Sequence, residues 1–473
     1  MTFGDRVVSF GGIRAPFSSE TDHSAACGDA GAPARFRGEW IVAGDAGYDE
    51  ARLRIFNERF DPHPPVIARC LGNSDVVAAL DYAREHGLPV TVRSTGLSLS
   101  GYSSTNDLTI DLSLMRGVLV DPATKTAWIQ GGATGGDQQI EASLHGLGAV
   151  TGMLGMIGVG QILGGGVGHL TRRIGYGCEH ILAVQMVTAD GQIVHASEDE
   201  NPELFWAVRG TMGNFGVVTA VKVQWYDMPS EVLAGDLIWE GERVREGMLM
   251  VRDAAEWSSE YLSILGFTEP GKLTVWVCHT GPRDLAEREI ERLLSRVAPD
   301  AGRVEPIGFP EYHFFHDDFF PRRALMEGSL PAPEFSDEVI DALVEWSVAE
   351  TPSPDTRRII EFACLNDGYR AMPVRQTAFR GTESPVTWNV MPCAWWDDPE
   401  DDVEEMTWMD QKFAELRRLT GLPEEIPPSQ RTGRIAAELA HGDVLPRLRE
   451  IKRAWDPENV FHANRNIVPA VNG

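Results

Sequence analysis

The feature that most constrains the fold of this chain is the segment Gly155–Gly168, in which seven of fourteen residues are glycine. A turn needs one or two glycines, whereas a run this dense is typical of chain against which another backbone or a flat ligand lies. Its spacing contains neither GxxxxGK[ST] nor GxGxxG, so it is neither a Walker loop nor a Rossmann fingerprint. The residues alone leave nucleotide binding and close packing open.

A strand–helix–strand pattern precedes the glycine segment. Residues 66–70 and 88–93 are short apolar runs that predict strands, and the periodicity of residues 75–86 predicts a helix that ends at Gly87. The loop after the second strand, Ser94–Gly101, combines small side chains with hydroxyls and main-chain N–H groups. Such a loop can wrap a pyrophosphate, because glycine allows close approach and the N–H groups act as donors.

The length of 473 residues exceeds the usual size of a single domain and predicts two lobes. Strand signals continue to about residue 225 and include Asp190-Gly191, a dipeptide that favours a two-residue hairpin turn. The stretch 230–420 then alternates strands with long acidic helices such as 284–297, which is typical of an α+β lobe with an antiparallel sheet. Residues 445–455 predict a last helix.

The chain is strongly acidic, with 42 Lys and Arg against 70 Asp and Glu and a net charge of −28. Such a surface repels phosphate backbones, so we expect no nucleic-acid partner. No run of about 18 apolar residues occurs and the N-terminus lacks a secretory pattern, so we expect a cytoplasmic protein without membrane contact, monomeric or homodimeric. The six cysteines contain no CxxC pair, so neither a metal site nor a disulfide framework is expected.

Four further stretches of sequence together resemble a known enzyme family. They are 92–104 (VRSTGLSLSGYSS), 170–180 (LTRRIGYGCEH), 188–219 (TADGQIVHASEDENPELFWAVRGTMGNFGVVT) and 451–467 (IKRAWDPENVFHANRNI). With the glycine segment, they resemble the berberine bridge enzyme-like oxidases of the p-cresol methylhydroxylase, or vanillyl-alcohol oxidase, superfamily. The resemblance covers nearly the whole chain after about residue 37, and residues 188–219 are its most specific part.

The resemblance implies an α+β chain, with a two-part FAD-binding domain of the p-cresol methylhydroxylase type and a substrate domain built on an antiparallel sheet. The FAD-binding domain is expected at residues 37–228, the substrate domain at 229–425, and a C-terminal segment returning to the FAD domain at 426–473. Residues 1–36 have no periodicity and are expected to form a flexible leader. FAD is the implied cofactor, with a small-molecule substrate and oxygen as reaction partners.

The same resemblance implies which residues hold FAD. The loop after the second strand holds the pyrophosphate, the glycine segment passes the flavin, residues before 219 lie along the adenine, and a terminal asparagine lies near the flavin ring. The residues concerned are Arg93, Ser94, Thr95, Gly96, Leu97, Ser98, Gly158, Gly160, Gly164, Gly165, Gly168, Gly216, Val218 and Asn464.

At two positions the chain departs from the family in a way that affects flavin attachment. Most relatives carry a flavin-linked histidine where this chain has Leu97, and bicovalent relatives add a cysteine near the position of Met153 or Leu154. Neither leucine nor methionine can form these bonds. We therefore expect a natural noncovalent subfamily, rather than an introduced change, in which hydrogen bonds and stacking retain the FAD.

A flavin oxidase needs a base near the bond that it cleaves, with a pKa near the working pH. The family's Y-x-N signature gives no candidate, because the stretch that matches it is Arg434-Ile435-Ala436. The candidates are His169, which follows the glycine segment, and Glu361 and Tyr369, which are expected where the substrate sheet meets the flavin. For His169 a packing role is the alternative.

Three other features have plainer explanations. The stretch 311–320 (EYHFFHDDFF) contains His313 and His316, but no third metal partner is in view, so an aromatic packing face is favoured over a metal site. Cys178 is expected to be a small buried apolar residue. His441 is expected to be exposed.

The leading hypothesis is an FAD-dependent oxidoreductase that transfers hydride from a small organic metabolite of specialised metabolism and returns electrons to oxygen. The first alternative is a non-redox relative that uses the same pocket for cyclisation, elimination or isomerisation. The second is a binding protein with a vestigial pocket, and the intact segments Gly158–Gly168 and Gly213–Val218 count against it.

Overall fold

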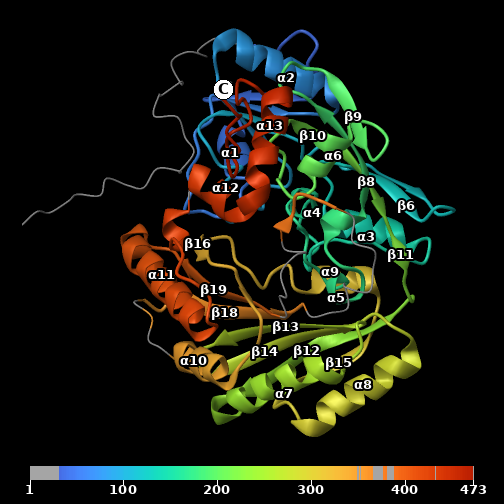
Figure 1. Ribbon diagram of the computed structural model, residues 1–473, viewed down its shortest axis with the longest axis vertical. Coiled ribbons are helices and arrows are strands. Elements are labelled where there is room, and N and C mark those ends of the chain that lie inside the picture. Colours follow the sequence, from blue (N-terminus) through green and yellow to red (C-terminus); the bar gives the residue numbers. More distant parts are fainter. Residues whose placement is uncertain are drawn as a thin grey trace, which may run out of the picture.

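Three large β-sheets organise the chain, two in a first lobe and one in a second (Figure 1). The computed structural model describes residues 31–348, 351, 353–365, 376–380, 388–431 and 433–471. The secondary structure is α+β, which confirms the expected fold class. None of the described helices is long and apolar enough to cross a membrane.

The first sheet contains the predicted strand–helix–strand unit. Its strands lie in the order β1 (Glu39–Val42), β2 (Val66–Arg69), β4 (Leu108–Asp111) and β3 (Val90–Arg93), with β2, β4 and β3 parallel. Helix α2 (Asn73–His86) buries Val76 and Leu80 against this sheet and ends at Gly87, whose φ of 62° favours glycine. A short helix, α1 (Tyr48–Arg52), follows β1.

The second sheet is antiparallel. Its strands lie in the order β5 (Val118–Asp121), β6 (Thr126–Gln130), β10 (Val217–Gln224), β8 (Ile181–Val187) and β9 (Ile193–Ser197). Around it lie α3 (Gly135–Ser143), β7 (Leu147–Gly148), α4 (Gly160–Leu163), α5 (Thr171–Ile174), a 3-10 turn (Gly177–His180), α6 (Pro202–Val208) and β11 (Tyr226–Asp227).

The hairpin between β8 and β9 exists, but the expected two-residue turn is wrong. The last paired residues are Val187 and Ile193, so five residues connect the strands. The Thr188 hydroxyl donates a hydrogen bond of 2.5 Å to Asp190, and the Gln192 side-chain amide donates one of 2.6 Å to the same carboxylate. These side-chain bonds stabilise a wider loop than the dipeptide alone indicates.

The second lobe is built on an antiparallel sheet of eight strands. In spatial order they are β15 (Ala301–Ile307), β12 (Val232–Glu240), β14 (Lys272–His279), β13 (Leu262–Glu269), β18 (Arg357–Cys364), β19 (Trp388–Trp396) and β16 (Ala324–Glu327), and β17 (Leu330–Ala332) also pairs with β19. The outer face is covered by α7 (Val244–Trp257), α8 (Arg283–Arg296), α10 (Asp337–Ser347) and α11 (Asp402–Leu419) (Figure 1).

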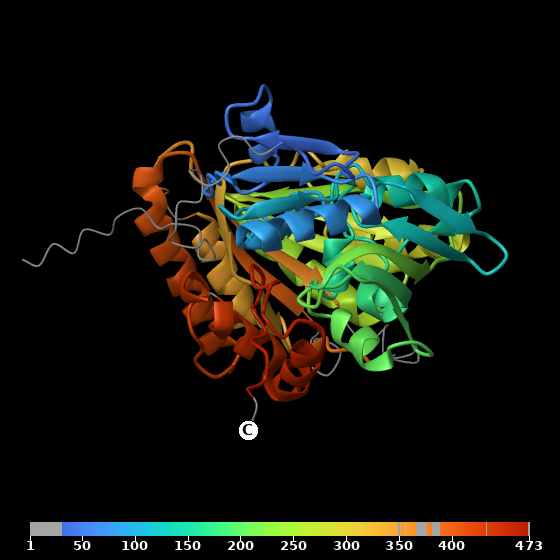
Figure 2. The ribbon, with the colours of Figure 1, turned by 90° about the horizontal axis from the view of Figure 1, so that it is seen from above.

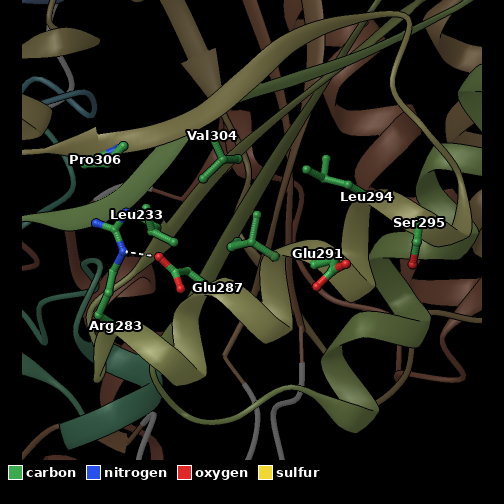
Figure 3. A pocket seen from close by; sticks show the side chains of 9 residues that line it. Leu233, Arg283, Glu287, Glu291, Leu294, Ser295, Val304 and Pro306 are labelled. Carbon is green, nitrogen blue, oxygen red and sulfur yellow. Dashed lines mark hydrogen bonds and ion pairs between the residues drawn. The ribbon is translucent and has the colours of Figure 1, made fainter.

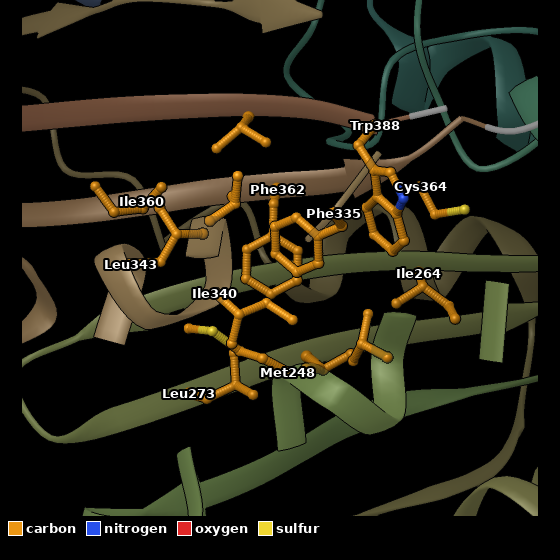
Figure 4. Packing of buried hydrophobic residues seen from close by; sticks show 14 of the residues in the cluster. Met248, Ile264, Leu273, Phe335, Ile340, Leu343, Ile360, Phe362, Cys364 and Trp388 are labelled. Carbon is orange, nitrogen blue, oxygen red and sulfur yellow. The ribbon is translucent and has the colours of Figure 1, made fainter. Parts of the chain in front are cut away.

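The strands of this sheet alternate between two apolar layers, as the two-residue period of a strand requires. On β18, Ile360 and Phe362 point into the core under the helices, where Figure 4 shows Phe362 beside Phe335. Ile359 and Ala363 of the same strand belong to a second cluster on the inner face of the sheet. That inner cluster also includes side chains from the first lobe, so the eight-stranded sheet covers it. This sheet is called the roof sheet below.

The C-terminal segment packs against the first lobe. Helix α13 (Leu445–Trp455) contacts α6 after a shorter helix, α12 (Gly433–His441), and Figures 1 and 2 show this red segment beside the green α6. Lys452 of α13 is fully buried and donates hydrogen bonds to the carbonyls of Asn214 and Phe461 and to the carboxylate of Asp456, at 2.6, 2.8 and 2.6 Å. One buried ammonium group thus joins the C-terminal segment to the loop before β10.

Candidate functional site

A cavity lies in the first lobe where β3, β10, α4 and the C-terminal segment meet. Five of the residues expected to hold FAD line it, namely Ser94, Gly160, Gly216, Val218 and Asn464. Val159 and Leu163 of the segment Gly158–Gly168 and Gly213 of the segment Gly213–Val218 also line it, whereas the sequence prediction missed Val90, Thr91, Val92, Leu112, Gly131, Met212, Phe461 and Ala463. None of these described lining residues is charged.

The glycines of the central segment are required for different reasons. A Cβ at Gly160 would meet no protein atom within 4 Å, so the absence of a side chain at this position leaves open space in the cavity. A Cβ at Gly168 would lie 1.8 Å from the Thr151 carbonyl oxygen, and one at Gly164 would lie 2.7 Å from Met212. Close packing therefore explains part of the glycine density, and access to the cavity explains another part.

The loop after β3 is held by hydrogen bonds that leave its main chain at the cavity. The guanidinium of Arg93 is buried and donates to the Ala51 carbonyl at 2.7 Å, so this side chain fixes the loop from behind. Ser94 donates its hydroxyl proton to the Gly131 carbonyl at 2.5 Å, and Ser98 accepts from the Tyr102 N–H at 2.9 Å. These contacts preorganise a loop of small residues next to Gly160.

Next to this loop, the inner cluster joins the two lobes. Leu97, Met153 and Val167 of the first lobe pack with Phe267 and Trp276 of the roof sheet. Its other described members are Phe56, Leu99, Leu154, Met156, Ile157, Leu265, Phe319, Phe320, Leu325, Ile359, Ala363, Leu365, Met391, Cys393 and Trp395. Leu97 and Met153 thus contribute hydrocarbon and thioether surface to the contact between the lobes.

Two carboxyl groups lie on the inner face of the roof sheet. Glu361 of β18 is opposite Met391 of β19, and Glu327 of β16 is opposite Cys393. Because Met391 and Cys393 are two residues apart on one strand, both glutamates point to the same face. Burial raises the pKa of Glu361 to about 8, and the neighbouring Glu327 adds to that rise. Burial likewise raises the pKa of Glu327 to about 7, against the opposing charge of Arg465.

His169 lies behind the glycine segment, enclosed by protein. It is 4% exposed, and its Nδ1 lies 3.4 Å from the hydroxyl oxygen of Ser263 on β13. Its ring centre lies 5.3 Å from that of His313, which belongs to α9 (Phe309–Phe315). Burial, together with the charges of His313 and His316, lowers the pKa of His169 well below its usual range. These contacts support the packing alternative for His169.

The remaining candidates fall in different places. Tyr369 lies outside the described residues. His441 is 2% exposed, so the expectation that it is exposed is wrong; α12 ends there and carries it inward, and burial lowers its pKa to about 4. Cys178 is fully buried, as expected. In the described ranges no group of three His, Cys, Asp or Glu residues could hold a metal ion.

A larger hollow, of about 540 Å³, lies on the outer side of the second lobe. Figure 3 shows Leu233, Leu294 and Val304 between α8 and β15, with the Arg283–Glu287 ion pair of 2.7 Å at its rim. The hollow is open and lies away from the glycine loops and the two carboxyl groups. Its polar lining residues are exposed side chains of the single helix α8, namely Arg283, Glu287, Glu291 and Ser295, so the cavity of the first lobe is the functional candidate.

The comparisons with known proteins agree with this location. Residues 64–197 match the family described as FAD binding domain, and residues 431–468 match the family described as berberine and berberine like. Over 460 residues the chain is 35% identical to (R)-6-hydroxynicotine oxidase of Paenarthrobacter nicotinovorans, with 92% of this chain and 98% of that relative covered. The chain belongs to the berberine bridge enzyme-like family. It is an FAD-dependent oxidoreductase, as its sequence predicted.

Solved structures of this family have the same fold. The crystal structure of 6-hydroxy-D-nicotine oxidase from Arthrobacter nicotinovorans gives a TM-score of 0.78 at 29% identity, covering 93% of this chain and 99% of that one. Berberine bridge enzyme-like 1 of Physcomitrella patens gives 0.81 at 19% identity, covering 93% and 98%. The chain therefore has the two-domain α+β fold of a p-cresol methylhydroxylase-type FAD-binding protein, with an antiparallel sheet in the second lobe.

The residues present fit a dinucleotide. Glycine main chain at Gly160 and Gly213 leaves room for a flat group, and the uncharged walls place no carboxylate against its phosphates. Asn464 is fixed at the cavity by a hydrogen bond of 2.6 Å from its side-chain amide to the Met212 carbonyl. When bound, FAD supplies the acceptor for a hydride, and proton transfer is left to the side chains of the protein.

Proposed function

We propose that this protein is an oxidase that holds FAD without a covalent bond, oxidises a small organic metabolite and uses oxygen as the electron acceptor. The observation that carries the noncovalent part is the apolar character of Leu97, Met153 and Leu154, all members of the inner cluster. One relative, 35% identical to this chain, is called an oxidase of hydroxynicotine, which supports a small organic substrate.

Glu361 is the base in this proposal. It lies on the inner face of the roof sheet, and its raised pKa of about 8 suits a carboxyl group that accepts a proton near neutral pH. No described residue donates a hydrogen bond to it, so its oxygen atoms are available to a substrate N–H or O–H. Apolar members of the inner cluster flank it, with Phe267 directly opposite on β13, and a low local polarity strengthens its interaction with a polar group of the substrate.

The experiment is an anaerobic titration of the purified holoprotein with candidate metabolites, followed by admission of air. An oxidase loses the absorbance of oxidised flavin with its substrate and regains it in air with formation of hydrogen peroxide. Turnover without any change in flavin absorbance would support the non-redox alternative instead. Glu361→Gln should lower the rate of flavin reduction by about 10²–10⁴-fold, the usual contribution of a general base, while FAD stays bound.

A further inference from the structure

Arg465, in the C-terminal segment, is a half-buried arginine without an acceptor for its N–H groups. Within the described part of the chain its guanidinium group has no hydrogen bond, ion pair or aromatic contact. The other described arginines that are not exposed each have at least one, as Arg431 has with Glu425 at 3.3 Å. All donors of the Arg465 fork therefore remain available to a ligand.

Arg465 lies where the cofactor cavity approaches the second lobe. The residue before it, Asn464, lines the cavity of the first lobe. The charge of Arg465 acts on Glu327 of the roof sheet and on His441 at the end of α12. Its guanidinium group thus borders the space between the roof sheet and the cofactor cavity, which is where the proposed oxidase binds its substrate.

His441 is a second polar group without a partner beside Arg465. It is 2% exposed, and neither of its ring nitrogens has a hydrogen-bond partner among the described residues. Burial lowers its pKa to about 4, and the charge of Arg465 adds to that change, so the ring is neutral and has one N–H to donate. A buried donor without an acceptor is costly, so an acceptor on a ligand would stabilise both groups.

The glutamates of the roof sheet do not neutralise Arg465 at neutral pH. Burial raises the pKa of Glu327 to about 7 and that of Glu361 to about 8, so a large share of both carboxyl groups is protonated there. Cys393, opposite Glu327, is also neutral, because burial raises the pKa of its thiol. The site therefore retains positive charge at Arg465.

The surroundings of Arg465 favour a carboxylate with an apolar body over a phosphate. Phe267 lies directly opposite Glu361 and belongs to the inner cluster, whose members are aliphatic, aromatic or sulfur-containing. A phosphate dianion needs more than one cation, yet Arg431, whose charge interacts with that of Arg465, is already paired with Glu425. A carboxylate needs one cation, and its hydrocarbon body can lie against the inner cluster.

We propose that Arg465 and His441 bind the carboxylate group of the substrate, which makes apolar carboxylic acids the substrate class and Arg465 a specificity-determining residue. This inference rests on the proposed oxidase function. The planar guanidinium group donates two parallel N–H bonds to a carboxylate, and the N–H of His441 adds a third donor. Glu361, on the inner face of the roof sheet, stays available as the base for an O–H or N–H elsewhere on the same substrate.

Binding tests this inference independently of turnover. Isothermal titration calorimetry of the holoprotein with benzoate, benzamide and benzylamine varies the charge of the head group on one ring. Benzoate should bind at least about tenfold more tightly than the other two, and Arg465→Gln should remove this preference, since tenfold is 1.4 kcal/mol. The matched control is Arg453→Gln, which changes an exposed arginine paired with Glu450 and should leave every affinity unchanged.

Titration of the flavin-free protein with FAD gives a second readout. Arg465→Gln should keep the FAD affinity of the wild type, because Arg465 serves the substrate in this proposal. A parallel loss of FAD and benzoate affinity would assign Arg465 to the cofactor and overturn the carboxylate site. Equal binding of benzoate and benzamide, a preference for benzylamine, or benzoate binding unaltered by Arg465→Gln would overturn it as well.

The two proposals fail in different ways. Benzoate bound with the predicted pattern to a protein whose flavin no metabolite reduces would contradict the oxidase alone. Flavin reduction only by substrates without a carboxylate would uphold the oxidase and contradict the inference. If Arg465→Gln does not fold, Arg465→Lys decides: lysine keeps the charge but loses the fork, so benzoate should bind more weakly than to the wild type and still more tightly than benzamide.

Discussion

Gly160 and Gly168 lie in the same glycine segment but are glycines for opposite reasons, and alanine should distinguish them. In Gly168→Ala the new Cβ would lie 1.8 Å from the Thr151 carbonyl, so the backbone must shift and the unfolding free energy should fall by roughly 2–3 kcal/mol. In Gly160→Ala the Cβ meets nothing within 4 Å, so stability should be unchanged while FAD affinity falls by about tenfold.

Thermal unfolding of the flavin-free protein and FAD titration by flavin fluorescence measure the two effects separately. Equal destabilisation in both variants would mean that Gly160 is also a packing glycine. Wild-type FAD affinity in Gly160→Ala would mean that this wall of the cavity does not contact the cofactor.

Glu361 should give the reaction an acid limb in its pH profile. Its base form is the deprotonated one, so the rate of flavin reduction should rise with pH and level off above its pKa of about 8. Because Glu327 contributes to that raised pKa, Glu327→Gln should move the limb to lower pH. Stopped-flow flavin reduction from pH 6 to 9, roughly the range around the pKa of Glu361, measures both curves. If the rate of flavin reduction rises over the same pH range in wild type and in Glu327→Gln, the two carboxyl groups do not interact.

At the residue scale the sequence predicted Glu361 but not its partner. Glu361 is visible because it interrupts the otherwise apolar run of β18 on the face that carries Ile359 and Ala363. Glu327 is the last residue of a four-residue strand, and only its register with β19 brings it to the same face. Register between strands distant in sequence is not a local property, so sequence periodicity could not show it.

At the scale of elements, helix α9 docks its histidine on the glycine segment. His313 is 1% exposed, its Nε2 lies 3.1 Å from the Gly152 carbonyl oxygen, and its Nδ1 lies 3.3 Å from that of Phe309. Burial lowers the pKa of His313 from 6.5 to about 4. The contact between α9 and the glycine segment thus contains a histidine that the fold keeps neutral.

That neutral histidine makes the stability of the protein depend on pH. Since the folded pKa is depressed, the unfolded chain takes up the proton first as the pH falls below 6.5, and stability is lost between about 6.5 and 4. His313→Gln should reduce this loss, whereas the control His145→Gln, at an exposed position, should not. Melting temperatures across this pH range test it, and parallel curves for wild type and His313→Gln would contradict it.

Helices and strands whose periodicity and end residues lie in one stretch of sequence could be predicted, but the loops between them could not. The structure confirms helix α2 and its end at Gly87, because the apolar periodicity and the terminal glycine that predict a helix both lie within the same short stretch of sequence. The loop between β8 and β9 differs from the expected turn because side chains of Thr188 and Gln192 both bond Asp190. His441, which was expected to be exposed, is carried inward by α12.

At the scale of the whole molecule, the buried Lys452 ammonium holds the C-terminal segment against the FAD-binding lobe through its hydrogen bond to the Asn214 carbonyl, and Asp456 of the same segment balances its charge. Lys452→Met would leave Asp456 buried without its partner, at a cost of about 3–5 kcal/mol. It should also weaken FAD binding, because Phe461 lines the cavity and its carbonyl accepts from Lys452. Arg453→Met, the control on the same helix, removes a surface pair with Glu450 that is worth about 1 kcal/mol or less.

Chemical denaturation and FAD titration of the two variants measure this difference. Similar stability in Lys452→Met and Arg453→Met would show that the buried ammonium is replaceable by packing. A stability loss without any change in FAD affinity would separate the C-terminal segment from the cofactor site.

The two-lobe architecture follows from the sequence, but the way the lobes meet does not. The glycine segment and the βαβ pattern of residues 66–93 left nucleotide binding open and only the family resemblance indicated a cofactor lobe, whereas the alternation in residues 230–420 predicted an antiparallel second lobe. The inner cluster joins Leu97 to Phe267 across 170 positions of sequence, counted as 267 minus 97. Contacts of that separation depend on the packing of whole sheets, which no local pattern encodes.

Noncovalent FAD at the cavity of the first lobe is the central claim, and acid precipitation tests it most directly. The absorbance of the purified protein is recorded, the protein is precipitated with acid, and the flavin is measured in supernatant and pellet. We expect a yellow protein that releases all of its flavin to the supernatant, whereas Leu97→His should retain a fraction in the pellet. A yellow wild-type pellet would contradict the noncovalent proposal, and a colourless protein that fails to bind added FAD would contradict the account as a whole.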